Sequence, residues 1–367
     1  MSDKRCSLLW NHVRIHVDGV ILPCCRFNQF AVTEEYAPLP KLEDGIDAGF
    51  NSQLFNKLRE DMSSGIEPEP CKDCYNTERF GNESMRTWFN KTYKSENKKI
   101  RYIETALSRH CNLACRMCND RFSSKWFQYL HPGEKVNVDN GSKILDYYDG
   151  DLSELDHIKF VGGEPLLEKN HVPFLIKLFE KSNKPENISL LYNTNGTVKP
   201  KEQVIDFWKR AAKIKIIFSI DGIGEVNEIL RPPHKWQTII DNIEYIKSLK
   251  DVNLEFDMHS VISILNVKHF PSLVEFSFKN FNKIPSFALL DYPEHLSLFH
   301  QTPDVKNDIK NFVIQNYKNI DEFGGSYVDH LVSKLDETRQ PEYTLEDVKE
   351  IEGNRHFFTN KIDSLLL

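Results

Sequence analysis

The chain has 367 residues, with 47 Lys and Arg against 54 Asp and Glu, a formal charge of −7 and 40% hydrophobic residues. This length suffices for one large core or a core with a smaller second domain, and the composition excludes a disordered or fibrous chain. The acidic balance argues against a protein that coats nucleic acid, and no apolar run approaches the roughly 18 residues of a membrane-spanning helix. The first residues lack the apolar run of a secretory signal, so we expect a cytoplasmic protein with no membrane or nucleic-acid partner.

Residues 1–90 are expected to form a small, loop-rich α+β domain. Alternating residues around the turn signal Asp18-Gly19 predict a β-hairpin over residues 12–22. A helix is expected over Ser52–Ser63. The lysine-rich segment 91–100 has few apolar residues, which predicts a solvated linker, with a docking face for an acidic partner as the alternative.

From residue 101 onward, short apolar strands alternate with amphipathic helices. The strands are expected at Tyr102–Leu107, Ile158–Val161, Ser189–Thr194, Ile214–Ile220, Leu254–Val261 and Ser286–Leu289. The helices are expected at Ser123–Leu130, Val172–Ser182, Glu202–Ala212, Gln237–Leu249, Ser272–Lys279 and Val305–Lys318. Six βα units of this spacing predict a parallel α/β sheet, open or curled into a partial, TIM-like (β/α)6 barrel over residues 101–320, with its chemistry at the carboxyl ends of the strands. Residues 321–367 are expected to form a charged, helical tail.

The eight cysteines fall into two groups, and none follows Cys118. In a reducing compartment, clustered thiols more often bind metal or carry out redox chemistry than form disulfides. Cys111, Cys115 and Cys118 have the spacing C-x3-C-x2-C directly after the first barrel strand. Three thiolates on so short a loop can hold three corners of a cubane iron–sulfur cluster and leave its fourth iron open. Structural zinc is the alternative, but it needs four ligands, and the adjacent His110 is poorly placed to be the fourth.

The cysteine trio and the motifs after it resemble the signature of the radical S-adenosylmethionine (SAM) superfamily. In the family's order, the second strand is followed by Gly162-Gly163-Glu164-Pro165, the third by Thr194-Asn195-Gly196 and the fourth by Ser219-Ile220-Asp221-Gly222. The resemblance covers residues 100–300. Taken alone, the two glycines could form an ordinary turn, but their place after the cysteine trio favours the loop that receives the amino group of SAM in this family.

The resemblance implies a set of SAM contacts. They are Met117, Gly162, Gly163, Glu164, Pro165, Thr194, Asn195, Ser219, Asp221 and Arg231. Ser219 can hydrogen-bond a ribose hydroxyl, and Arg231, otherwise a surface cation, can pair with a carboxylate at two points. Met117 stands where the family often has an aromatic residue beside the adenine, and a thioether can pack there too. A competing dinucleotide motif that begins at Gly222 is rejected because its sixth position is Asn227.

The amino-terminal cysteines resemble a second module. Cys6, Gly19 and Cys24 give the pattern C-x12-G-x4-C, and Cys71 and Cys74 follow later; together they resemble the half-size auxiliary-cluster module called twitch, a relative of the SPASM module. The resemblance implies that Cys6, Cys24, Cys71 and Cys74 hold a second [4Fe-4S] cluster, which acts as an electron conduit or a structural clamp. Cys25 is spare or exchanges with Cys24. A four-cysteine zinc knuckle is the alternative.

Inside the barrel, ionisable residues alternate with apolar ones along the fifth expected strand and are expected to face inward. With the end of the sixth strand, they supply the candidates for substrate contact or proton transfer. These are Glu255, Asp257, His259, Asp291 and Tyr292. Ordinary solvated edges and loop turns are the alternative.

The resemblance implies two [4Fe-4S] clusters, SAM and a flavodoxin- or ferredoxin-type electron donor. It also implies that reductive cleavage of SAM gives a 5′-deoxyadenosyl radical, which abstracts hydrogen from the substrate. We expect the substrate to be a peptide or protein that is dehydrogenated, crosslinked or epimerised. The alternatives are the same chemistry on a small molecule, such as an amino sugar, alcohol or nucleoside, and a non-catalytic metal-cluster scaffold that binds a partner.

Overall fold

The computed structural model describes residues 4–79, 81, 83–93, 97–135, 144–148, 152–182, 184–316, 331–333, 335–337, 339–355 and 362–366. No helix in these ranges is long and apolar enough to cross a membrane. The predicted tail, residues 321–367, lies partly outside them. Its described parts include helices α14 (Leu345–Gly353) and α15 (Asp363–Leu366).

A single eight-stranded sheet organises the fold, in the order β2-β1-β3-β4-β5-β6-β7-β8. Its strands are β1 (His12–Ile15), β2 (Ile21–Leu22), β3 (Tyr102–Ala106), β4 (His157–Val161), β5 (Ser189–Thr194), β6 (Lys213–Ser219), β7 (Leu254–Ile262) and β8 (Ser286–Leu289). From β3 to β8 each strand pairs with the next in parallel. This confirms the expected α/β class with a parallel sheet, and the six predicted strands match β3 to β8.

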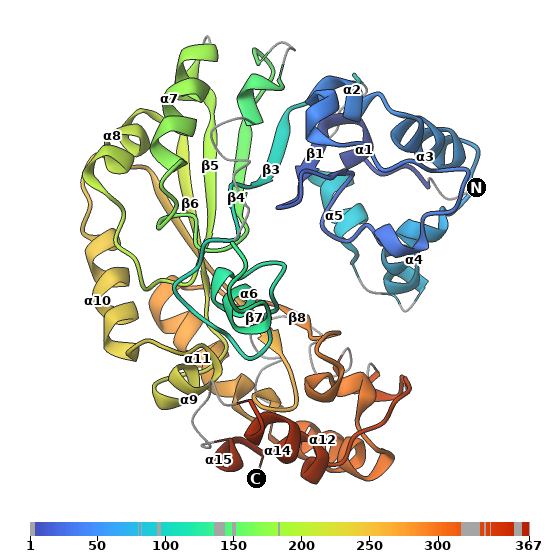
Figure 1. Cartoon of the computed structure of the whole chain (residues 1–367), viewed down its shortest axis with the longest axis vertical. Helices are drawn as coiled ribbons and strands as arrows, with labels where there is room; N and C mark the ends of the chain where they lie inside the picture. Colours follow the sequence, from blue (N-terminus) through green and yellow to red (C-terminus); the bar gives the residue numbers. More distant parts are fainter. Residues whose placement is uncertain are drawn as a thin grey trace.

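Helices follow the strands and cover one face of the sheet, with α7, α8 and α10 stacked along its side in Figure 1. After β3 the helices are α6 (Ser124–Leu130), α7 (His171–Lys181), α8 (Glu202–Arg210), α9 (Glu225–Leu230), α10 (Trp236–Lys247), α11 (Phe270–Phe281) and α12 (Pro303–Asn316). The core lies between the sheet and these helices because alternate residues of β5 and β6 are buried, and all of these except Thr194 are apolar. Tyr192 of β5 packs on Trp208 of α8, and Phe218 of β6 packs on Phe281 of α11.

The opposite, inner face of the sheet carries the other half of each strand, and this half includes ionisable residues. In the strand register, Lys215 of β6 lies beside Glu255 of β7, and two residues further along Ile217 lies beside Asp257. Two residues beyond that, at the carboxyl end of β6, Ser219 lies beside His259. The expected inward alternation on β7 is therefore present, and the register ranks its residues by their distance from the carboxyl edge of the sheet.

The amino-terminal hairpin joins this sheet rather than standing apart from it. Strand β1 pairs with β2 antiparallel, as predicted, but it also pairs with β3 in parallel. Helices α1 (Leu8–Asn11), α2 (Ile46–Phe50), α3 (Gln53–Ser63), α4 (Lys72–Arg79) and α5 (Met85–Thr92) surround the hairpin. The N–H of Lys99 donates to the carbonyl of Trp10 (3.0 Å), so the end of the expected linker runs along this unit. The division into 1–90, 91–100 and 101–320 stays a prediction, with a sheet that is continuous across it.

Candidate active site

The cysteine trio lies on a loop that follows the carboxyl end of β3. Cys115 is buried, and Cys111 and Cys118 are partly buried. Burial raises the pKa of all three thiols, and the nearby Cys115 raises that of the other two further, to about 12 for Cys118. The three thiols are therefore neighbours in a poorly hydrated place, where a cationic centre is needed to hold them as thiolates.

Three thiols on one short loop are a suitable donor set for three irons of a cubane cluster, with the fourth iron left for another ligand. Among the residues that the structure describes, no three His, Cys, Asp or Glu side chains are arranged to hold a single metal ion. By its donor chemistry the loop fits the expected cluster, which Cys111, Cys115 and Cys118 would hold.

Two glycines after β4 pack directly on the backbone of the cysteine loop. A Cβ atom on Gly162 would lie 2.6 Å from the carbonyl oxygen of Ser108, and one on Gly163 would lie 2.1 Å from that of His110. The N–H of Gly163 donates to the Ser108 carbonyl (3.1 Å), and the N–H of Glu164 donates to the His110 carbonyl (2.7 Å). Glycine is required because the two loops touch through their backbones. The two glycines thus let the loop after β4 pack closely on the backbone just before Cys111, a role that the sequence alone does not indicate.

The buried carboxylate of Glu164 gathers residues from two motifs. Its Oε1 accepts from the Thr194 hydroxyl (2.9 Å), and its Oε2 accepts from the N–H of Asn195 (2.7 Å). Burial raises the pKa of Glu164 to about 7, although these hydrogen bonds act in the opposite direction. The amide nitrogen of Asn195 lies 4.0 Å from the sulfur of Cys111. Three predicted SAM contacts therefore meet beside the first cysteine.

The predicted Arg231 and Asp221 meet beside the second cysteine. The Nε of Arg231 donates to Oδ2 of Asp221 (2.6 Å), and both residues are buried. Nη1 of Arg231 lies 3.8 Å from the sulfur of Cys115. Asp221 thus orients the guanidinium, which is a buried cation at the cysteine loop rather than a surface cation.

The side chains of the other predicted SAM contacts have no described interaction with the cysteine thiols. Met117 is partly buried and packs against the main hydrophobic core, and Pro165 is buried. Ser219 ends β6 on the inner face of the sheet. Their roles in SAM binding stay predictions.

The substrate candidates lie at different heights on the sheet. His259 is level with Ser219, its Nδ1 lies 3.0 Å from the Ser286 hydroxyl, and burial lowers its pKa to about 4, so the ring is neutral at pH 7. Asp257 lies one step lower and pairs with Lys215 (3.2 Å). Of the three candidates on β7, His259 is therefore the nearest to the carboxyl edge of the sheet.

The remaining candidates have no described interaction with the predicted SAM contacts. Glu255 is lower on β7 and pairs with Lys213 and Lys283, each at 2.7 Å. Asp291 pairs with Arg339 (2.8 Å) in an exposed position, and Tyr292 is 63% exposed. The structure does not bring these three residues together with the SAM contacts.

The four amino-terminal thiols predicted as ligands are also neighbours. Burial is the main cause that raises the pKa of Cys24, and the nearby thiols of Cys25, Cys6, Cys71 and Cys74 raise this pKa further. Backbone contact between the two halves of the module supports this arrangement, since the N–H of Asn28 donates to the carbonyl of Pro70 (2.9 Å). Four thiols are a complete donor set for a cubane cluster, so this module fits the expected auxiliary cluster.

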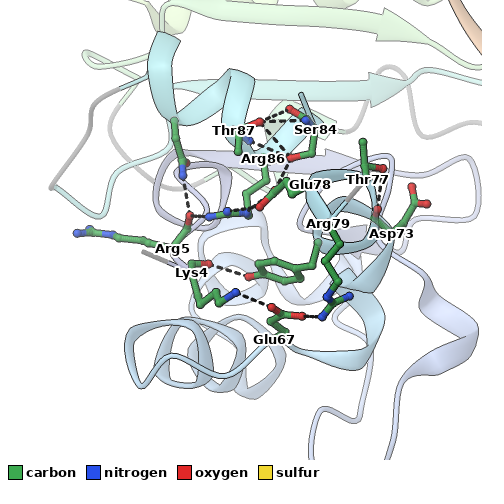
Figure 2. A network of polar contacts seen from close by, with 12 residues as sticks. Lys4, Arg5, Glu67, Asp73, Thr77, Glu78, Arg79, Ser84, Arg86 and Thr87 are labelled. Atoms are coloured by element: carbon green, nitrogen blue, oxygen red, sulfur yellow. Dashed lines mark hydrogen bonds and ion pairs between the residues drawn. The ribbon is translucent and has the colours of Figure 1, made fainter. Parts of the chain in front are cut away.

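Polar contacts hold the segment before Cys6 against α4 and α5, as Figure 2 shows. The hydroxyl of Tyr75 donates to the carbonyl of Lys4 (2.7 Å), and Nη1 of Arg86 donates to the carbonyl of Arg5 (2.7 Å). Arg86 also pairs with Glu78 (2.5 Å). These contacts bring Cys6 to the helix that carries Cys74. Cys25 lies outside them, with its thiol 3.7 Å from the sulfur of Met85.

Sequence reasoning missed two buried asparagines that position Asp221. The N–H of Asp221 donates to Oδ1 of Asn227 (3.1 Å), and Nδ2 of Asn266 donates to the carbonyl of Asp221 (2.8 Å). In the sequence, Asn227 carries no signal beyond its place as the residue that breaks a dinucleotide motif. Asn266 follows β7 and has no periodic or spacing signal that could have identified it.

Two family models match the chain. The model of the radical SAM superfamily matches residues 105–276, and that of SPASM, an iron–sulfur cluster-binding domain, matches residues 6–75. The first contains the cysteine trio and the SAM contacts, and the second contains the other four predicted ligands.

Curated relatives share parts of this sequence. An uncharacterised protein of Methanocaldococcus jannaschii is 28% identical over 207 residues, which are 54% of this chain and 66% of that protein. A GTP 3′,8-cyclase of Helicobacter pylori is 25% identical over 169 residues, 46% of this chain and 49% of that enzyme. The chain thus spans about half to two thirds of the length of these relatives.

Solved structures also resemble the chain at low identity. Native anSMEcpe with bound AdoMet is 21% identical, covers 60% of each chain and has a TM-score of 0.40. Streptococcus suis SuiB bound to S-adenosylmethionine is 17% identical, covers 73% of this chain and 57% of its own, and has a TM-score of 0.41.

The family matches agree with the site. The cysteine trio, Glu164 with its partners Thr194 and Asn195, and the pair of Arg231 with Asp221 all lie within the matched radical SAM range. The matches imply SAM and iron–sulfur clusters as cofactors. Residues 105–276 are therefore a radical SAM domain, the domain of a superfamily of enzymes, and residues 6–75 are a SPASM-type iron–sulfur domain on its amino-terminal side.

Proposed function

We propose that this enzyme cleaves SAM reductively at a [4Fe-4S] cluster held by Cys111, Cys115 and Cys118, and that it modifies a peptide or protein by hydrogen abstraction. The observation that carries the proposal is the convergence of Glu164, through Asn195, and of Arg231 on this cysteine loop. When bound, the cluster and SAM supply the 5′-deoxyadenosyl radical that removes a hydrogen atom.

Two buried groups of the chain, one acidic and one basic, match the two charged ends of the amino-acid part of SAM. The Glu164 carboxylate would receive the amino group of SAM, and the Arg231 guanidinium, which Asp221 orients, would receive its carboxylate. Because the pKa of Glu164 is about 7, an arriving ammonium shifts this residue toward its carboxylate form. Both groups are buried, so their attraction to a charged ligand is weakly screened by water.

A peptide substrate is supported by the SPASM match, since the resemblance associates that module with peptide modification. A small-molecule substrate is the second candidate, because GTP 3′,8-cyclases are among the curated relatives. The auxiliary cluster, held by Cys6, Cys24, Cys71 and Cys74, would serve electron transfer or rigidity, since its ligand set is complete. A flavodoxin- or ferredoxin-type protein is the proposed electron donor.

The first test is anaerobic reconstitution with iron, sulfide, dithionite and SAM, followed by assay of 5′-deoxyadenosine. Replacing Cys111, Cys115 and Cys118 with Ala should remove one cluster's iron and all SAM cleavage. Replacing Cys71 and Cys74 should remove the other cluster's iron and reduce product formation more than SAM cleavage. Cys25→Ala is the matched control and should change neither iron content nor cleavage. Fully loaded protein that releases no 5′-deoxyadenosine would favour the scaffold hypothesis instead.

The second test separates the substrate classes. Cell extract from bacteria grown in deuterated water is divided by size into peptide and small-molecule fractions, and each is offered to the enzyme with unlabelled SAM. Deuterium in 5′-deoxyadenosine marks the fraction that contains the substrate. Label from the peptide fraction supports the first candidate, and label from the small-molecule fraction alone would replace it with the second.

A further inference from the structure

A buried carboxylate from the carboxyl-terminal helix α14 reaches the cysteine loop. Glu352 is 2% exposed and forms an ion pair with Arg116, which is 1% exposed and lies between Cys115 and Cys118. These partners are 236 residues apart in the sequence. A buried ion pair is costly unless its groups are fully hydrogen-bonded, so such a pair at this point of the fold needs an explanation.

The carboxylate of Glu352 is shared by two further partners. Nη1 of Arg355 lies 2.8 Å from Oε1, and Nε2 of His295 lies 2.9 Å from the same oxygen. Arg116 on the cysteine loop, Arg355 after α14 and His295 after β8 thus meet at one side chain. Because both carboxylate oxygens are engaged, Glu352 has little freedom to move without breaking several contacts.

Arg116 passes this restraint to the segment that carries Arg231. Its Nε donates to the carbonyl of Ile229 (2.9 Å), and its N–H donates to the carbonyl of Leu230 (2.8 Å). A third hydrogen bond runs from the N–H of Ala114 to the carbonyl of Pro232 (2.6 Å). Arg231 lies between these acceptors in the sequence. Glu352, which restrains Arg116, therefore also restrains the backbone that positions the Arg231 guanidinium beside Cys115.

Arg355 adds a second contact with the same loop. Its guanidinium lies 5.1 Å from the ring centre of Trp126, and the indole N–H of Trp126 donates to the carbonyl of Cys115 (2.9 Å). The carboxyl-terminal segment therefore touches the cysteine loop on two sides, through Arg116 and through Trp126.

We propose that Glu352 is a positioning residue for the radical SAM site: through Arg116 it holds the cysteine loop and the Arg231 segment in register with each other. This inference rests on the proposed function for its effect on SAM. The packing of the cysteine loop on the Arg231 segment does not depend on cofactors, so it can be measured in the metal-free protein.

The first experiment is amide hydrogen exchange on the full-length, metal-free protein and its Glu352→Gln variant. The amides of Ala114 and Arg116 should lose protection by about tenfold or more, because removing one partner of a buried ion pair is strongly destabilising locally. The amides of the β5–β6 ladder should keep their protection. Thr344→Ala is the matched control: Thr344 caps α14 by accepting from the N–H of Asp347 (3.1 Å), so its loss weakens the helix without removing the carboxylate. This control should leave Ala114 and Arg116 protected.

The second experiment measures SAM binding on the Cys71→Ala/Cys74→Ala background, where only the loop cluster contributes an electron paramagnetic resonance signal. In Glu352→Gln, the SAM-induced change in that signal should require about tenfold more SAM, because the guanidinium is no longer held in place. The double variant Arg116→Gln/Glu352→Gln should lose less affinity than the sum of the losses in the two single variants, since both changes break the same ion pair.

Unchanged protection of Ala114 and Arg116 in Glu352→Gln would overturn the proposal. Protection lost across the whole sheet would also overturn it, because the residue would then stabilise the fold at large. If the wild-type protein binds no SAM, the proposed function fails, while the exchange experiment still decides the role of Glu352.

Discussion

The ion pairs of Glu104 join the amino-terminal hairpin to the barrel, and their removal tests how strongly the two are coupled. In the strand register Glu104 of β3 lies between Arg14 of β1 and Lys159 of β4. Its side chain is 4% exposed, and its oxygens lie 3.1 Å from Arg14 and 3.2 Å from Lys159. We predict that Glu104→Gln destabilises the protein because two partly buried cations, 17% and 19% exposed, then lose their counter-charge.

The magnitude follows from the pKa of Glu104. Burial alone raises this pKa, but Lys159 and Arg14 outweigh burial and hold it at about 2, compared with an ordinary value of 4.5. This difference corresponds to about 3 kcal/mol of unfolding free energy at neutral pH. Since the folded-state pKa is the lower one, the contribution is complete above pH 4.5 and is lost as the pH falls toward 2. At pH 3 roughly half of it should remain.

The assay is urea unfolding of the metal-free protein at pH 7 and pH 3, followed by circular dichroism. Glu255→Gln is the matched control, since the pKa of Glu255 is also held at about 2, by Lys213, Lys283 and Lys215 against burial. The side chains of Lys213 and Lys283 are 45% and 41% exposed, so water screens these pairs and their loss should cost less than about 1 kcal/mol. Equal costs for the two variants, or a cost for Glu104→Gln that does not shrink in acid, would refute the reasoning.

Two further predictions concern the site itself. Gly163→Ala should displace the cysteine loop, because its Cβ would lie 2.1 Å from the His110 carbonyl; iron content should fall to about that of the auxiliary cluster, whereas Gly353→Ala, with no atom within 4 Å, should bind the full amount. SAM should bind up to about tenfold more tightly as the pH rises from 6 to 8, because Glu164, with a pKa of about 7, then becomes the carboxylate that meets the ammonium. Equilibrium dialysis measures this slope, and its persistence in Glu164→Gln would contradict the assignment.

The sequence by itself determined the parallel α/β class, the positions of the barrel strands and the cysteine groups. These features are local. Strand and helix periodicity is set within each segment, and the trio Cys111–Cys118 spans one short loop, so its spacing alone indicates a shared metal site. The ordered motifs also predicted that Glu164, Asn195 and Arg231 belong to one site, and the structure brings them to the cysteine loop.

Only the tertiary structure decided which distant groups meet. The pairing of β1 with β3 joins segments about 90 residues apart, and the contact between Glu352 and Arg116 joins residues that are 236 positions apart. Neither has a local signal. The alternation within a strand does not say which other strand it pairs with, and a buried charge in the sequence looks the same as a solvated one until its partner is known. Likewise, the ionisable residues of β7 share one alternation, and only the register with β6 shows that His259 lies beside the carboxyl end of β6 while Glu255 lies four residues before it.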